Sequence, residues 1–169
     1  MEDKIAKFLR VDQAGEIGAV RIYQGQLAVL KGKAAIEMVR HMAKQEHHHL
    51  ATFDRLIEER NVRPTLLGPL WHAAGFALGA ATAFMGEKAA MACTAAVEEV
   101  IDGHYAAQAV QLGEDEAPLR AVIEEFQADE QQHRDTALAN GAEQAVGYPV
   151  LSAVIKAGCR AAIWMAERV

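Results

Sequence analysis

The sequence is short of the residues that would indicate a secreted or an all-β protein. It contains 2 cysteines and 4 prolines in 169 residues. Cys93 and Cys159 are too few and too far apart for a disulfide framework or a zinc site made of cysteine pairs. Valine and isoleucine recur at helical spacings and do not alternate with polar residues, which disfavours a sheet. These absences favour a helical protein that stays in a reducing compartment.

Positive charge is also scarce. The chain has 17 Lys and Arg against 23 Asp and Glu, for a formal net charge of -6. No basic stretch with interleaved aromatic residues occurs, so we expect no nucleic-acid partner. The first residues, from Met1 to Lys4, have neither the apolar core of a signal peptide nor the Arg- and Ser-rich composition of a transit peptide. We therefore expect a protein that remains where it is synthesised.

Hydrophobic residues are abundant, at 51% of the chain. The length corresponds to about one domain, and residues 1–169 are expected to form a single helical unit. Glycine and proline positions predict helices over the following ranges: about 12–30, 34–60, 69–112 with a break near Gly86, 118–140 and 148–169. The expected fold is all-α, a ferritin-like four-helix bundle made of two hairpins, about 12–60 and 87–140. Further hydrophobic helices are expected at about 65–86 and 148–169.

These two further segments are more apolar than a small bundle needs. Residues 65–86 carry no charge, and His72 is their only ionisable side chain. The length is close to the roughly 20 residues that span a bilayer, but the segment is rich in Ala and Gly. The C-terminal segment is amphipathic, with Lys156, Arg160 and Arg168 off its apolar face. Two interpretations stay open: packing on the bundle or a dimer interface, and a helix pair lying in the membrane surface.

The pattern Glu-x-x-His occurs twice, as Glu46 with His49 and Glu130 with His133. Residues three apart share one face of a helix, so each carboxylate can point the same way as its imidazole. The spacing alone proves little in a chain rich in Glu and His. Both pairs, however, lie on the apolar stripe of their helix, where a buried carboxylate needs a metal or a countercharge. No Lys or Arg lies on these stripes, which favours a metal.

An internal repeat identifies two more carboxylates. A glutamate is followed at the same offsets by a tyrosine and a glutamine in Glu16, Tyr23 and Gln26, and again in Glu98, Tyr105 and Gln108. The repeat selects Glu98 over Glu99, because adjacent residues on a helix differ in direction by about 100°. Each hairpin thus supplies one Glu and one Glu-x-x-His. The six predicted metal ligands are Glu16, Glu46, His49, Glu98, Glu130 and His133.

Four carboxylates and two imidazoles from four helices match the ligand set of di-iron and di-manganese carboxylate bundles. Oxygen donors with some imidazole suit iron or manganese better than zinc. The alternative is a polar core in which the same Glu and His side chains simply bind one another.

Two residues near Glu98 are candidates for a supporting role. His104 and Tyr105 lie six and seven residues beyond it. They could orient a ligand, or relay protons and electrons to the metals. Ordinary core packing is the alternative.

Other polar and small residues receive simpler interpretations. His47 and His48 lie off the ligand stripe and are expected to be solvated. Asp12 is predicted to cap the start of the first helix. Gly15 and Gly18 flank Glu16 and would let a backbone or a ligand approach closely.

Four stretches of the sequence resemble the demethoxyubiquinone hydroxylases: LRVDQAGEIGAVRIYQGQ, PLWHAAGFALGAATAFMG, MACTAAVEEVIDGHYAAQ and DEQQHRDTAL. The similarity covers nearly the whole chain from Leu9 onward. The family's iron ligands fall on the same six residues that the spacing and the repeat select. The resemblance implies two iron ions per chain and O₂-dependent hydroxylation of a demethoxyubiquinol ring, in the penultimate step of ubiquinone biosynthesis.

The resemblance also implies partners and a location. The substrate would be a polyprenyl quinol, with electrons from NADH or from the quinol itself. Peripheral membrane binding would favour the interfacial interpretation of the two apolar segments and bring the protein into contact with lipids and other ubiquinone-biosynthesis proteins. Without an import extension, the expected place is the cytoplasmic face of a bacterial inner membrane, or the matrix side of the mitochondrial inner membrane for a trimmed eukaryotic form. The oligomeric state stays open, with a homo-oligomer as one alternative.

Two rival functions remain at this point. A ferritin-like protein that oxidises or stores iron would use a similar ligand set but would not need the apolar segment 65–86. A non-catalytic lipid-binding bundle at the membrane surface would need the apolar segments but no intact metal site.

Overall fold

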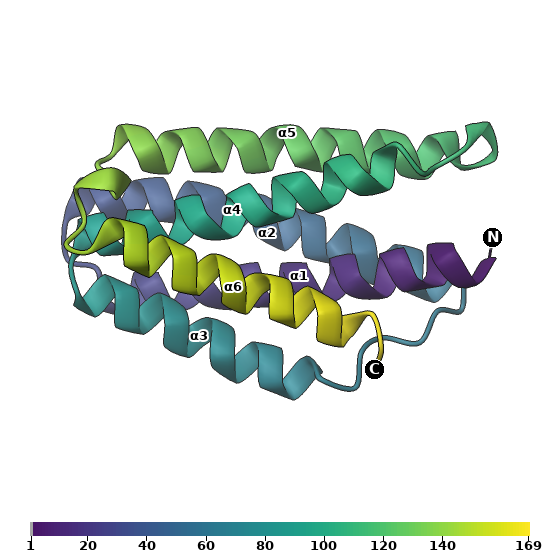
Figure 1. Cartoon of the computed structure of the whole chain (residues 1–169), viewed down its shortest axis with the longest axis horizontal. Coiled ribbons are helices and arrows are strands. Elements are labelled where there is room, and N and C mark those ends of the chain that lie inside the picture. Colours follow the sequence, from purple (N-terminus) through teal and green to yellow (C-terminus); the bar gives the residue numbers. More distant parts are fainter. Residues whose placement is uncertain (1) are drawn as a thin grey trace.

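The computed structural model describes residues 2–169, whose regular elements are all helices. They are α1 (Glu2–Val29), α2 (Lys33–Glu59), α3 (Gly68–Phe84), α4 (Glu87–Ala109), α5 (Ala117–Ala139) and α6 (Tyr148–Ala166), with two short 3-10 helices, η1 (Glu114–Glu116) and η2 (Ala142–Gln144). The helices run roughly parallel to one long axis (Figure 1). The all-α prediction is confirmed.

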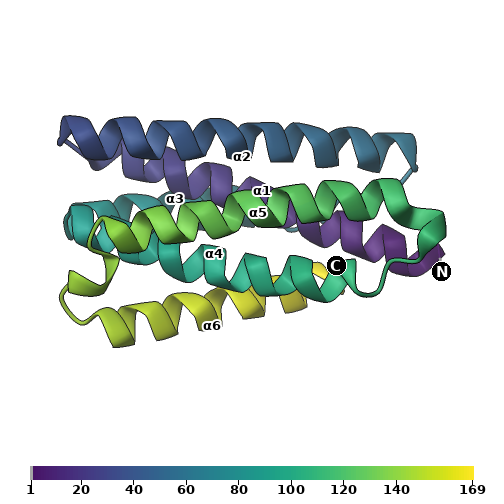
Figure 2. The ribbon, with the colours of Figure 1, turned by 90° about the horizontal axis from the view of Figure 1, so that it is seen from above.

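Four of the helices form the bundle. α1 packs along α2, and α4 packs along α5, so each hairpin of the sequence repeat is a pair of neighbouring helices. α3 lies along α1, and α6 lies along α4. Both extra helices therefore cover the side of the bundle made by α1 and α4, away from α5 (Figures 1 and 2).

Most predicted boundaries agree with the structure, with one difference at the start of the first helix. The break in the third segment is real and separates α3 from α4 at Gly86, whose φ of 120° is a conformation that glycine adopts more easily than other residues. The first helix begins at Glu2 and not near residue 12. Ile5, Phe8 and Leu9 are buried at helical spacing, and this periodicity was the available signal for the earlier start.

Small residues explain how α3 packs. A Cβ atom at Gly25 of α1 would overlap the carbonyl group of Phe76, and one at Gly79 of α3 would overlap the carbonyl of Ile22. The backbones of α1 and α3 therefore approach so closely that only glycine fits at these points. The Gly- and Ala-rich composition of segment 65–86 serves this helix contact. The segment thus packs on α1 through one face, and a position of its other face in the membrane surface stays a prediction.

Apolar side chains fill the bundle at two places along its length. One cluster is centred on Val39, Met42 and Met91, and the other on Leu9, Phe53 and Ile123. Burying each such side chain contributes about 1.5–3 kcal/mol. The predicted metal ligands lie on the same inward faces of α1, α2, α4 and α5, and these apolar residues provide the rigid frame around them.

Candidate metal centre

The structure brings all six predicted ligands together in the interior of the bundle. All six residues are buried, with at most 1% of their surface exposed. Two groups of possible donor atoms form, with all atoms in a group within 4.8 Å of one another. The groups are Glu16, Glu46, His49 and Glu130, and Glu46, Glu98, Glu130 and His133. Glu46 and Glu130 belong to both, so two ions bound to these groups would share two carboxylates.

The distances within the cluster are those of groups that face a common centre. The Nδ1 atom of His49 lies 3.2 Å from an oxygen of Glu130, and the Nδ1 atom of His133 lies 2.9 Å from an oxygen of Glu46. Among the described residues, neither oxygen of Glu46 or of Glu130 has a hydrogen-bond partner, and neither Nδ1 atom has one. Unpartnered buried polar atoms are costly, so this donor set fits a pair of bound cations.

The electrostatics of the cluster lead to the same conclusion. Burial and then the neighbouring carboxylates raise the pKa of Glu46 and of Glu98 well above the usual range, and the pKa of Glu130 to about 7. Burial alone would lower the pKa of His49, but the carboxylates of Glu130 and Glu16 outweigh it and raise that pKa to about 11. Burial lowers the pKa of His133. Four acids held against two imidazoles are short of positive charge, which divalent ions would supply.

Each tyrosine of the repeat contacts the glutamate of the other repeat. The hydroxyl of Tyr23 on α1 donates to Glu98 on α4 at 2.6 Å, and the hydroxyl of Tyr105 on α4 donates to Glu16 on α1. Burial raises the pKa of both phenols, so they remain hydrogen-bond donors at neutral pH. One oxygen of each glutamate is thereby held, and the other faces the cluster.

The glutamines of the repeat follow the same rule. Gln26 donates to Thr94, four residues before Glu98, and Gln108 donates to Asp12, four residues before Glu16. The N-cap prediction for Asp12 is wrong, because α1 starts ten residues earlier and Asp12 is only 2% exposed. Burial raises its pKa. Sharing a helix face with Glu16 was the one sequence signal for this inward position.

His104 lies at the edge of this network. Its Nε2 atom is 2.8 Å from Nε2 of Gln108 and 3.3 Å from Asp12, and its side chain is 20% exposed. His104 thus connects the buried Asp12 to the surface. The other polar predictions agree with the structure: His47 and His48 are exposed, and Glu99 points away from the cluster to bind Lys156 at 2.6 Å.

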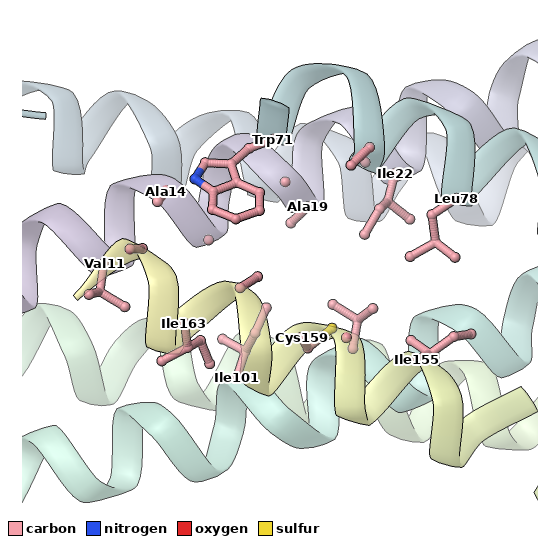
Figure 3. A pocket seen from close by; sticks show the side chains of 18 of the residues that line it. Val11, Ala14, Ala19, Ile22, Trp71, Leu78, Ile101, Ile155, Cys159 and Ile163 are labelled. Atoms are coloured by element: carbon pink, nitrogen blue, oxygen red, sulfur yellow. The ribbon is translucent and has the colours of Figure 1, made fainter. Parts of the chain in front are cut away.

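An apolar cavity of about 390 Å³ lies between α1, α3, α4 and α6. Figure 3 shows its lining, with Trp71 on one side and Ile101 and Cys159 on the other. Gly15 and Gly18 both line it, and a Cβ at either would meet no atom within 4 Å. Both glycines therefore border open space, and the close approach of a ligand to them stays a prediction. The cavity also touches Val97, so its lining includes the sequence neighbours of Glu16 and Glu98, although neither glutamate is among the lining residues.

Comparison with known proteins identifies the family to which this chain belongs. The family described as "Ubiquinone biosynthesis protein COQ7" matches residues 3–166. The chain is a member of the COQ7 family. The resemblance seen in the sequence is therefore confirmed over nearly its whole length.

Relatives of this COQ7 protein are enzymes by name. A "3-demethoxyubiquinol 3-hydroxylase" of Rhodospirillum rubrum is 64% identical over 166 residues, covering 98% of this chain and 78% of the relative. Two relatives named "NADPH-dependent 3-demethoxyubiquinone 3-hydroxylase, mitochondrial" are 47% identical in Dictyostelium discoideum and 46% identical in Homo sapiens. The match to the Dictyostelium protein covers 98% of this chain, and the match to the human protein covers 97% of it. Each match covers 77% of the relative's length.

Proposed function

We propose that this COQ7-family protein is a 3-demethoxyubiquinol 3-hydroxylase that works with two iron ions. The observation that carries the proposal is the cluster of six buried donors, in which two carboxylates are shared between two potential centres. The 64% identity to the Rhodospirillum rubrum enzyme supports the reaction and its place in ubiquinone biosynthesis. A site that had lost its function would not keep this complete set of unpartnered buried donors.

The six residues divide the work between two metal positions. His49 and Glu16 would hold one ion, His133 and Glu98 the other, and Glu46 and Glu130 would bind both. Iron, when bound, supplies the activation of O₂ and the transfer of one oxygen atom to the ring. The protein holds Glu16 and Glu98 in place through the two tyrosines and keeps bulk water out by burial.

The apolar cavity is proposed as the site of the quinol ring and the start of its polyprenyl tail. Its volume is in the range of sites that bind small molecules, and aliphatic and glycine residues dominate its lining. The indole Nε1–H of Trp71 has no hydrogen-bond partner among the described residues. That nitrogen is itself buried, so the indole ring of Trp71, which lines the cavity, is the part that we expect to contact the quinol.

His104 and Tyr105 are proposed to support the metal centre. Tyr105 fixes one oxygen of Glu16, and His104 links the partly exposed surface to Asp12 and Gln108. Together they would orient Glu16 and provide a hydrogen-bonded route by which a proton reaches the site. Electrons are proposed to come from a reduced nicotinamide nucleotide. The sequence leaves NADH and the quinol itself open as donors, and the names of the Dictyostelium discoideum and Homo sapiens relatives favour testing NADPH as well.

The outer faces of α3 and α6 are proposed to rest on a membrane. Val150 and Val154 of α6 are 70% and 65% exposed, Trp164 is 56% exposed, and Phe84 at the end of α3 is 85% exposed. α6 is also long and apolar enough to cross a bilayer by length and composition alone. Its contribution to the cavity wall, through Ile155 and Cys159, instead favours a helix that lies on the membrane and lets a lipid-soluble substrate enter.

The proposed activity is tested with the protein loaded anaerobically with Fe²⁺ and given a demethoxyubiquinol analogue and O₂, with NADH or NADPH as reductant. We expect about two irons per chain and a product that has gained one oxygen atom by mass spectrometry. Iron oxidation without quinol product would favour the storage protein, and lipid binding without iron would favour the non-catalytic bundle.

A pair of glycine variants tests the cavity. Gly18→Leu would fill it, because the new side chain projects into open space along the lining. We expect normal iron content with strongly reduced product. Gly103→Leu is the matched control, because Gly103 is also in a helix with open space around it but lies outside the cavity. Equal activity of the two variants would contradict the assignment of the cavity to the quinol.

Membrane contact is tested at the surface of α6. The double variant Val150→Glu/Trp164→Glu should bind lipid vesicles less and retain its iron, since neither residue lines the cavity. Val110→Glu is the control, because Val110 is 87% exposed beyond the end of α4. These changes are preferable to truncation after Gly147, since α6 forms part of the cavity wall. Unchanged vesicle binding of the double variant would contradict the proposal.

A further inference from the structure

The outer nitrogens of the two histidines are held by one hydrogen-bonded pair that joins α2 and α5. The Nε2 atom of His49 lies 3.0 Å from Oδ2 of Asp129, and the Nε2 atom of His133 lies 3.1 Å from Oε1 of Gln45. Gln45 in turn donates its Nε2–H to Oδ1 of Asp129 at 3.0 Å. Each histidine is thus bound by a residue of the opposite hairpin, and the two binding residues contact each other.

Gln45 and Asp129 occupy equivalent positions in the sequence repeat. Each directly precedes the glutamate of a Glu-x-x-His pattern, Glu46 in one case and Glu130 in the other. The repeat brings them together, yet it does not make them identical. One is a neutral amide that both donates and accepts, and the other is a carboxylate that only accepts.

This difference is required by the hydrogen bonds. Each of the two residues must accept a proton from an imidazole Nε2–H, and one must also donate to the other. Two carboxylates would face each other without a donor, and two amides would bring two N–H groups together on one side. One amide and one carboxylate satisfy all three bonds.

We propose that Gln45 and Asp129 act as a single positioning unit, which fixes both imidazoles as Nε2–H tautomers and directs both Nδ1 atoms at the metals. The inference rests on the proposed metal centre. In agreement with it, both Nδ1 atoms face the carboxylate cluster and are unpartnered among the described residues. A hydrogen bond on the outer nitrogen of a histidine ligand fixes the orientation of the ring and raises its basicity as a ligand.

The unit makes a specific prediction about exchange of its two members. Gln45→Glu leaves two carboxylates in contact, and Asp129→Asn leaves two amides in contact, so each single change breaks one bond. The double variant Gln45→Glu/Asp129→Asn restores all three bonds with the donor and the charge exchanged. If the two residues instead acted independently, their losses would add and the double variant would show no recovery.

The experiment measures Co²⁺ affinity, with Co²⁺ as an oxygen-stable substitute for Fe²⁺. We expect each single variant to bind Co²⁺ about 10- to 100-fold more weakly than the wild type, and the double variant to recover most of that loss. The controls are Gln131→Glu and Asp102→Asn, because Gln131 donates to Asp102 at 2.9 Å between α5 and α4, outside the site. Neither control should change Co²⁺ affinity.

The outcomes separate this inference from the proposed function. If the wild type binds no Co²⁺, the metal centre itself is wrong. If it binds two ions and either single variant binds them equally well, or the double variant does not recover, the positioning unit is wrong. Should a single variant fail to fold, the wild type loaded with Zn²⁺ decides the matter by NMR: two slowly exchanging imidazole N–H protons are expected, and their absence would overturn the inference.

Discussion

The hydroxyl of Tyr23 lies 2.6 Å from a carboxylate oxygen of Glu98, so a residue of the first hairpin holds a proposed ligand of the second. Tyr105 and Glu16 repeat the contact in the opposite direction. The repeat in the sequence is therefore more than a trace of two similar hairpins. It produces reciprocal bonds across the bundle, and neither hairpin can complete its half of the site alone.

Removing one of these hydroxyls should cost stability. Tyr23→Phe keeps the ring but leaves a buried oxygen of Glu98 without its donor, and a hydrogen bond to a charged group contributes about 1.5–3 kcal/mol. We expect the free energy of unfolding of the metal-loaded protein, measured in urea, to fall by about that amount. Tyr148→Phe is the control, since Tyr148 lies outside the site at the start of α6; an equal loss there would contradict this reasoning.

A variant of Tyr105 can show whether this residue only orients Glu16 or also takes part in proton transfer. Tyr105→Phe should lower the free energy of unfolding as Tyr23→Phe does, since both phenols bind a buried glutamate. If Tyr105 also takes part in proton delivery with His104, product formation per bound iron should fall much further in Tyr105→Phe than in Tyr23→Phe. Iron content and initial rates of both variants are the measurements. Equal rates per bound iron would limit Tyr105 to orienting Glu16.

The six candidate ligands could be predicted from sequence because each depends on a local rule. Two residues that share a helix face, and a repeat that fixes the register, need no knowledge of long-range contacts. Asp12 shows where such rules stop. An acid near an expected helix start has the same local pattern whether it caps the helix or is buried in it, and only its contacts with Gln108 and His104, almost a hundred residues away, distinguish the two.

Removing the metals should destabilise the protein in a pH-dependent way. The folded, metal-free cluster holds Glu46, Glu98 and Glu130 at raised pKa values, with Glu130 at about 7. An acid whose pKa is raised by folding binds its proton more tightly in the folded state. Its stabilising effect is therefore complete below the unfolded pKa, near 4.5, and is lost as the pH rises through the folded value.

The measurement is thermal unfolding of chelator-treated protein between pH 5 and pH 8. We expect the melting temperature to fall as the pH rises through this range, and the fall to be much smaller in the metal-loaded protein, where the carboxylates are ligands. A metal-free protein that is equally stable at both pH values would show that the cluster is satisfied by internal hydrogen bonds, which is the polar-core alternative.

The contact between α1 and α3 offers a test of packing. Gly79→Ala places a Cβ atom on the carbonyl of Ile22, and because the neighbour is backbone it cannot turn aside. Overpacking of this kind costs about 1–3 kcal/mol, against a gain of about 1 kcal/mol from helix propensity. We expect a net loss in urea unfolding. Gly103→Ala, at a helical glycine with open space, should be neutral or stabilising; a stable Gly79→Ala would mean that the two helices are further apart.

The same contact explains why the sequence left the position of residues 65–86 open. Composition shows that a helix is apolar and rich in glycine but not which face its glycines meet. A membrane-interfacial helix and one packed on α1 have the same composition, and α3 presents Gly75 and Gly79 to α1 while Leu70 and Phe84 remain exposed. Only the three-dimensional arrangement separates the two faces.

Glu98 and Glu99 are adjacent acids with opposite surroundings, and they provide the sharpest test of the site. Glu98 is 1% exposed and bound to Tyr23, with its second oxygen facing the cluster, whereas Glu99 is exposed and pairs with Lys156. Glu98→Gln keeps the volume but removes an anionic ligand, so iron per chain and product should both fall strongly. Glu99→Gln breaks a surface ion pair worth about 0–1 kcal/mol and should leave both near normal.

The two variants are to be compared side by side for iron content, product formation and melting temperature. The metal-free Glu98→Gln protein should be no less stable than the metal-free wild type, because it has lost one of four crowded carboxylates. That combination, a weakened metal site in a protein that folds well, would identify Glu98 as a ligand and not as a structural residue. If Glu99→Gln is instead the variant that loses iron, the register of α4 and the repeat that selected Glu98 are both wrong.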